Sequence, residues 1–116
     1  MKKYTVNART TEIKIRLDRL EADLLTAEML NRKVDAQIER SMNGDPDESY
    51  EFDTLEEALK KFEELKTIEL TVYHESNGLL DVYQVYIDED EVDEDGCIDF
   101  GDTIRFFTNS NVRWVA

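Results

Sequence analysis

Apolar and polar residues alternate at the start of the chain and then take on a helical spacing. The alternation predicts a first strand and involves Tyr4, Val6 and Ala8. Further along, apolar residues recur every three or four positions, as on one face of a helix. These residues are Leu17, Leu20, Leu24, Ala27, Leu30, Val34 and Ile38. We therefore expect a long helix near the N-terminus.

The two ends of this helix depend on short signals. Ile13, Ile15 and Leu17 fit a strand as well as a helix, so the start is open between Thr11 and Asp18, and we favour the earlier position. Asn43-Gly44, with Pro46 shortly after, predicts the end, because glycine caps a helix and proline cannot continue one.

A second, shorter helix is predicted from Thr54 to about Lys66. Thr54 and Glu57 have the spacing of a capping box, in which each side chain satisfies a free backbone amide of the first turn. The apolar stripe of this helix consists of Leu55, Ala58, Leu59, Phe62 and Leu65. A short extended segment, 50–52, precedes it.

A β-hairpin is predicted around Asn77-Gly78, because this dipeptide favours the two-residue turn that joins antiparallel strands. Such a turn places Val72 opposite Tyr83 and His74 opposite Asp81. The core face would then hold Ile68, Leu70, Val72, Tyr83, Val85 and Ile87. Residues 97–100, 103–108 and 112–115 predict further short strands.

Together these elements predict one α+β domain over residues 1–116. We expect an antiparallel sheet of four to five strands, covered on one face by the long N-terminal helix and the shorter second helix. The helices should bury Leu20, Leu24, Leu55, Leu59 and Phe62 against the core face of the hairpin.

Composition excludes several classes of function. With 28 acidic and 14 basic residues, the chain has a net charge of -14, which disfavours direct binding to nucleic acid or to a membrane surface. Residues 1–7 lack the apolar stretch of a signal peptide, and the single Cys97 permits no internal disulfide. We therefore expect a cytoplasmic protein.

The negative charge is unevenly distributed along the chain. Residues 1–40 hold nine basic and seven acidic residues, so the rest of the chain carries a net charge of -16. Two blocks contain no basic residue: 45–57, with seven acids, and 81–102, with ten. We expect these blocks to supply the surface that meets a partner.

Few residues suit catalysis. His74 is expected to form a cross-strand polar pair with Asp81, and the carboxylates around Cys97 disfavour the thiolate that nucleophilic chemistry requires. We therefore predict that the protein is not an enzyme and uses no cofactor.

Segment 91–102 resembles the twelve-residue calcium loop of EF-hand proteins. Seven residues match loop positions 1, 3, 5, 6, 8, 9 and 12: Glu91, Asp93, Asp95, Gly96, Ile98, Asp99 and Asp102. Glu91 and Asp102 depart from the usual Asp and Glu at the loop ends, and the flanks predict strands rather than helices. We therefore predict no metal site, and we keep divalent-metal binding through Glu91, Asp93, Asp95 and Asp102 as an alternative.

In its size, acidity, α+β character and lack of catalytic motifs, the chain is similar to the small anti-restriction and anti-CRISPR proteins of phages and mobile elements. This resemblance implies a non-enzymatic inhibitor that mimics nucleic acid and blocks a basic nuclease or CRISPR effector. A second alternative is an accessory or structural domain whose acidity serves only to keep it in solution.

The partner is accordingly expected to be a basic protein. If this partner is a nuclease, it has a nucleic-acid-binding site of its own. The predicted partner-binding residues come from both base-free blocks. They are Asp88, Glu89, Asp90, Glu91, Asp93, Glu94, Asp95, Asp99 and Asp102, together with Asp45, Asp47, Glu48, Glu51 and Asp53.

Overall fold

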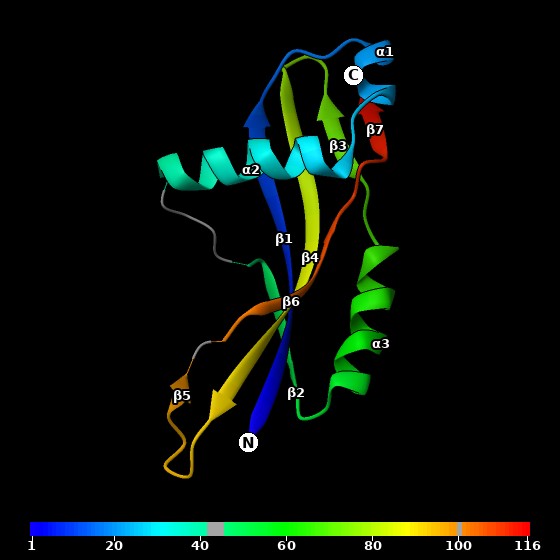
Figure 1. The fold of residues 1–116 in the computed structure, drawn as a ribbon. Helices are drawn as coiled ribbons and strands as arrows, with labels where there is room; N and C mark the ends of the chain where they lie inside the picture. The colour runs from blue at the N-terminus through cyan, green and yellow to red at the C-terminus, as the bar shows by residue number, and fades with distance from the viewer. Residues whose placement is uncertain (42–45, 100) are drawn as a thin grey trace.

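The computed structural model describes residues 1–41, 46–99 and 101–116, with the side chains of 39–41 and 99 excepted. The described residues form an α+β fold with one seven-stranded sheet and three helices (Figure 1). The strands are β1 (Lys2–Lys14), β2 (Glu48–Phe52), β3 (Thr71–His74), β4 (Leu79–Val92), β5 (Ile98–Asp99), β6 (Thr103–Thr108) and β7 (Val112–Val115). The helices are α1 (Arg19–Asp23), α2 (Ala27–Ser41) and α3 (Leu55–Lys66).

The two long strands β1 and β4 pair antiparallel along their whole length and form the spine of the sheet. The ladder runs from Lys2 opposite Glu91 to Lys14 opposite Leu79. We call the part of the spine around residues 2–8 of β1 the lower half, and the remainder the upper half. The lower half is flanked by β2, β6 and β5. In the upper half, β3 pairs with β4, and β7 joins β3 in parallel. The sheet is therefore mixed.

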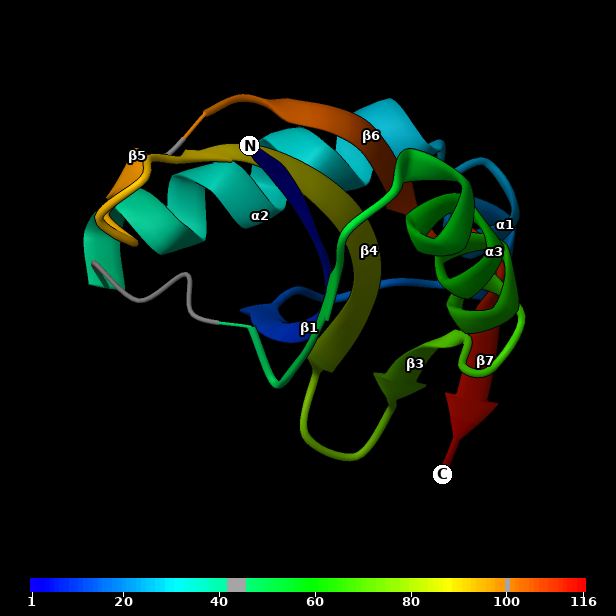
Figure 2. The same ribbon diagram turned by 90° about the horizontal axis from the view of Figure 1, so that it is seen from below.

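Two hydrophobic cores lie on opposite faces of this sheet. In the lower half, α3 packs Ala58, Phe62 and Leu65 against a face that includes Tyr83, Val85 and Ile87. In the upper half, α2 packs Leu30 and Val34 against Leu80 and Val82. Successive residues of a strand point to opposite faces, so these two sets on β4 require helices on both sides. Figures 1 and 2 show α2 and α3 on different sides of the spine.

The prediction of a long N-terminal helix over a sheet of four to five strands is wrong. Strand β1 continues to Lys14, because β4 is equally long and offers each residue a partner. Two short polar caps then divide the helical segment: Asp18 Oδ1 accepts a hydrogen bond from Glu21 N, and Thr26 Oγ1 accepts one from Met29 N. The favoured start at Thr11 is therefore wrong, and Asp18 begins α1 as its N-cap. The predicted end at Asn43-Gly44 lies outside the described residues.

The hairpin is present, but its predicted register is wrong by two residues. His74 lies opposite Leu79 and Val72 opposite Asp81, so the turn comprises residues 75–78 rather than two residues. The amides of Asn77 and Gly78 both donate to His74 O, and Gly78 takes a φ of 64°. A shift of two residues keeps each side chain on its predicted face.

The expectation that both helices cover the same face is also wrong. As a consequence, several residues predicted to be buried in the core are exposed or half-buried. Leu20 and Leu24 are 71% and 66% exposed, while Leu25 is buried in their place. Ile68 and Leu70 precede β3 and are exposed, and Leu55 and Leu59 are half-buried. Helix α3 itself is confirmed from the Thr54 cap to Lys66, with Phe62 in the core.

Candidate docking face

Four carboxylates of the two acidic blocks lie on one face of the lower half, on either side of β1. Thr5 is paired with Glu51 of β2 on one side and with Asp88 of β4 on the other. Two residues along, Lys3 is paired with Asp90, and its Nζ lies 2.5 Å from Asp53 Oδ1. Directly paired residues share a face. We call the surface formed by Glu51, Asp53, Asp88 and Asp90 the acidic face.

The acidic face lies opposite the face that α3 covers. Val6 and Ala8 of β1 contact α3, so the alternate residues Lys3 and Thr5 point away from it. Figure 2 shows α3 on one side of the lower half only. Glu51 and Asp53 are exposed, and Asp88 and Asp90 are half-buried. These carboxylates are therefore accessible to a partner.

Positive charges from the N-terminus compensate part of the acidity of the two blocks, and Lys3 does so on the acidic face itself. Lys3 Nζ also lies 3.5 Å from Glu51 Oε1, Lys2 Nζ lies 3.0 Å from Glu89 Oε1, and the terminal amine lies 3.0 Å from Glu91 Oε1. The neighbouring carboxylates raise the pKa of Lys2 and of Lys3. The blocks are base-free along the sequence, but the pairing of β1 with β4 brings bases to them in space.

Two of the predicted partner-binding carboxylates accept hydrogen bonds from neighbouring strands and linkers. Asp88 accepts hydrogen bonds from Thr103 Oγ1 at 2.5 Å and from Asn7 Nδ2 at 3.2 Å. Asp90 Oδ1 accepts from Gly101 N at 3.2 Å. The bonds from Thr103 and Gly101 fasten the start of β6 to β4, and the bond from Asn7 joins β4 to β1. These carboxylates therefore have a structural role in addition to their charge.

Asp93 organises the turn between β4 and β5. Its Oδ1 accepts from Asp95 N and from Cys97 N, and Gly96 takes a φ of 82°. The described residues around this turn therefore belong to strands, whereas the calcium loop of an EF-hand is flanked by helices. Within the described part of the chain, no group of three His, Cys, Asp or Glu side chains is placed to hold a metal ion.

The remaining predicted residues lie elsewhere. Glu94 and Asp95 are exposed at the β4–β5 turn, and Asp102 is exposed just before β6. Glu89 and Glu91 alternate with Asp88 and Asp90 and therefore point to the other face. Asp45 and the side chain of Asp99 lie outside the described residues.

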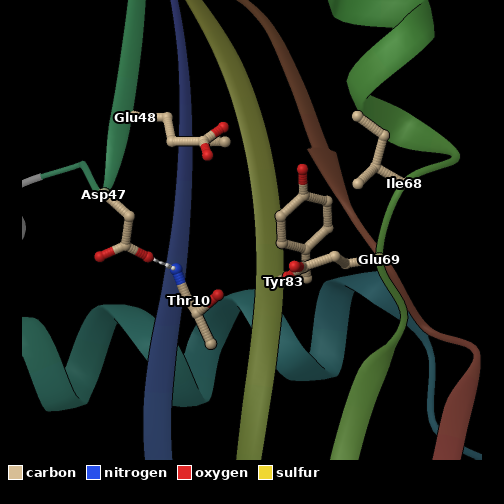
Figure 3. Close-up of a pocket in the computed structure, with 7 residues that line it drawn as sticks. Thr10, Asp47, Glu48, Ile68, Glu69 and Tyr83 are labelled. Atoms are coloured by element: carbon tan, nitrogen blue, oxygen red, sulfur yellow. Dashed lines mark hydrogen bonds between the residues drawn. The ribbon is translucent and has the colours of Figure 1, made fainter.

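Asp47 and Glu48 line a hollow of about 190 Å³ on the α3 side of the sheet. Asp47 Oδ2 accepts from Thr10 N at 2.7 Å. Figure 3 shows these two residues on one side of the Tyr83 ring, with Ile68 and Glu69 on the other. Burial, together with the charges of Glu69 and Glu48, raises the pKa of Tyr83 to about 12. Because Asp47 and Glu48 lie on the α3 side of the sheet, they do not belong to the acidic face.

An aromatic stack that the sequence pattern did not single out borders the acidic face. Phe106 of β6 is paired with Tyr86 of β4, and their ring centroids are 5.7 Å apart at an interplanar angle of 17°. The guanidinium of Arg9 lies 5.2 Å from the Tyr86 centroid and 5.8 Å from that of Phe106. The register of β6 on β4, which the sequence does not specify, creates this stack.

The two candidate catalytic residues are far apart along the spine. His74 Nε2 lies 2.8 Å from Asp81 Oδ2 at the end of the hairpin, so the predicted polar contact is present, but the two residues are diagonal rather than directly opposite. Cys97 is exposed in the turn at the opposite end of β4. None of the described helices is long and apolar enough to cross a membrane.

A scan against models of protein families found no match for this chain, and searches of curated proteins and of solved structures found none either.

Proposed function

We propose that the protein is a non-enzymatic binding protein whose acidic face docks on a basic protein. The partner we propose is a nucleic-acid-binding protein such as a nuclease or CRISPR effector, which the chain would block by mimicking nucleic acid. The observation that carries this proposal is the placement of Glu51 on β2, of Asp53 directly after β2, and of Asp88 and Asp90 on β4, on the same side of the sheet.

The spacing of these carboxylates supports mimicry. Glu51 and Asp88 flank the same residue of β1, so two strand spacings, about 10 Å, separate the backbones of their two rows. Residues two apart in one row are separated by about 7 Å. A rigid sheet thus presents two lines of negative charge at a separation between the widths of the minor and major grooves of DNA, about 6 and 12 Å.

The test compares two variants that lose the same charge. Glu51→Gln with Asp53→Asn removes the two exposed carboxylates of the acidic face. Asp35→Asn with Glu56→Gln removes two exposed carboxylates on α2 and α3. Asp88 and Asp90 are left in place, because each accepts hydrogen bonds that hold β6.

Association would be measured by surface plasmon resonance against a panel of purified basic nucleases and other DNA-binding proteins. For a binding member, we expect the association rate to fall steeply as salt shortens the Debye length from about 10 Å at 0.1 M to about 3 Å at 1 M. Duplex DNA should compete. The acidic-face variant should associate several-fold more slowly, and the control variant at nearly the wild-type rate.

Three results would contradict the proposal. These are a panel with no binding member at low salt, binding that duplex DNA leaves unchanged, and equal rates for the two variants. Each of them would favour an accessory domain whose charge serves only to keep it in solution.

A further inference from the structure

Phe106 is a large aromatic side chain that the fold leaves 45% exposed. One side of its ring stacks on Tyr86, which is buried. The other exposed large apolar residues of the described chain, which include Met1 and Ile98 in the lower half and Leu20 and Leu24 in the upper half, are not aromatic. Phe106 is therefore the exposed aromatic ring that borders the acidic face.

The strand register places this ring within reach of the carboxylates. Phe106 is opposite Tyr86, and Asp88 follows two residues along β4 on the same face. Asp88 is held by Thr103 and Asn7, yet a carboxylate has about four acceptor positions, so it can accept further N–H groups. An aromatic surface thus adjoins an ordered carboxylate with spare acceptor capacity.

Arg9 shows which side chain fits this combination. Its guanidinium lies over Tyr86 and Phe106, while its Nε donates to Gln84 Oε1 at 2.8 Å. A planar guanidinium can stack on a ring and donate in its own plane at the same time, whereas an ammonium group is compact and more strongly hydrated. The same surface chemistry therefore selects arginine over lysine.

We propose that the part of the Phe106 ring that Tyr86 and Arg9 leave exposed anchors an arginine side chain of the basic partner, with Asp88 accepting its N–H groups. This inference rests on the proposed docking of the acidic face and adds a division of labour to it. The carboxylates would attract the partner and set the association rate, while the aromatic contact would hold it and select arginine.

The experiment uses two fluorescent twelve-residue peptides that differ only in having arginine or lysine at four positions, separated by glycine and serine. Binding to the full chain would be followed by fluorescence anisotropy at low salt. We expect the arginine peptide to bind about two- to five-fold more tightly than the lysine peptide, the preference given by an exposed cation–π contact.

Three variants test whether the Phe106 ring causes the preference for the arginine peptide. Phe106→Leu keeps an apolar side chain over Tyr86 but lacks the ring, so the preference should disappear; Phe106→Ala should have the same effect. Leu24→Ala, which truncates an exposed apolar residue on the upper half, should leave the preference intact. Circular dichroism would confirm that each variant is folded, and Phe106→Leu decides the result if the alanine variant is not.

The outcomes separate this inference from the proposed function. Glu51→Gln with Asp53→Asn should weaken both peptides equally. If that variant has no effect on either peptide, the docking role of the acidic face is wrong. If both peptides are weakened but folded Phe106→Leu still prefers arginine, the docking role stands and the assignment of Phe106 is wrong.

Discussion

Gln84 is fully buried, yet each polar atom of its side chain has a partner. Nε2 donates to Asn31 Oδ1 and to Thr108 Oγ1 at 3.0 Å each, and Oε1 accepts from Arg9 Nε. Asn31 belongs to α2 and Thr108 to β6, so one amide connects a helix and an edge strand to the spine. A buried polar group is tolerated only when its hydrogen bonds are made, and these bonds fix where α2 crosses β4.

Tyr83 leads to a prediction about alkaline pH. Its pKa is about 12 in the folded chain and close to 10 when unfolded, because folding buries the hydroxyl, which donates to Leu65 O at 3.1 Å. The unfolded state therefore loses its proton first as the pH rises. We expect the stabilisation from the neutral phenol to be complete below pH 10 and to be lost between pH 10 and 12.

Tyr83→Phe is the variant that tests this expectation. It should be less stable than wild type at pH 7 by about 1 kcal/mol, for the lost hydrogen bond, and should lose less stability between pH 10 and 12. Lys2 and Lys3 also have raised pKa values, so part of the alkaline loss should remain. Urea unfolding at a series of pH values would measure this, and parallel curves for the two proteins would refute it.

At the scale of elements, side-chain caps decide how the helical segment is divided. The apolar spacing from Leu17 to Ile38 is continuous, but Asp18 and Thr26 each accept a backbone amide and begin a separate helix. The spacing of Ile13 and Ile15 fits a strand as well as a helix. Pairing with β4 favours the strand up to Lys14, and this partner is distant along the chain.

The junction between β5 and β6 requires a residue without a side chain. A Cβ built on Gly101 would lie 2.0 Å from the carbonyl oxygen of Glu89, and this oxygen belongs to the backbone of β4. We expect Gly101→Ala to destabilise the fold by about 1 to 3 kcal/mol, because β6 must move away from β4.

Gly96→Ala provides the comparison for this prediction. Gly96 has open space around it, so the cost there is only that of an L-residue at positive φ, about 1 kcal/mol. Thermal unfolding of both variants would rank them. A Gly101→Ala protein as stable as Gly96→Ala would show that the junction is not tightly packed.

At the scale of the whole molecule, charge is concentrated in the lower half. The chain has a net charge of -14, and the carboxylates of the lower half are only partly compensated by Lys2, Lys3 and the terminal amine. Like charges on a compact protein repel one another, whereas exposed ion pairs contribute about 1 kcal/mol or less each. Repulsion should therefore dominate the response of stability to salt.

We accordingly expect the melting temperature to rise as the NaCl concentration increases from about 0.05 M to about 0.5 M, because the Debye length, about 10 Å at 0.1 M, shortens with salt and screens the repulsion. Lys3→Gln removes the cation between Glu51 and Asp53, so its melting temperature should rise more steeply with salt. Differential scanning calorimetry would measure both. A wild-type melting temperature that falls with salt would mean that the ion pairs outweigh the repulsion.

The sequence by itself determined the elements whose signals are local. The capping box at Thr54, the stripe of α3, the hairpin around residues 75–78 and the short strands after Cys97 all follow from spacing over a few residues. The sequence also named the four acids of the acidic face, but only as part of a set of fourteen whose other ten members lie elsewhere or outside the described residues. Propensity, caps and turn chemistry act between neighbours in the chain, so a reading of neighbours can detect them.

Tertiary structure alone decided the features that depend on distant pairing. Pairing of β1 with β4 extended a strand through a helical spacing and brought positive charges from the N-terminus to the base-free blocks. Pairing of β1 with both β2 and β4 placed Glu51 and Asp88 beside the same residue. Pairing of β6 with β4 stacked Phe106 on Tyr86. One strand pattern is compatible with several partners and registers, and the final choice depends on how both faces of the sheet are covered at once.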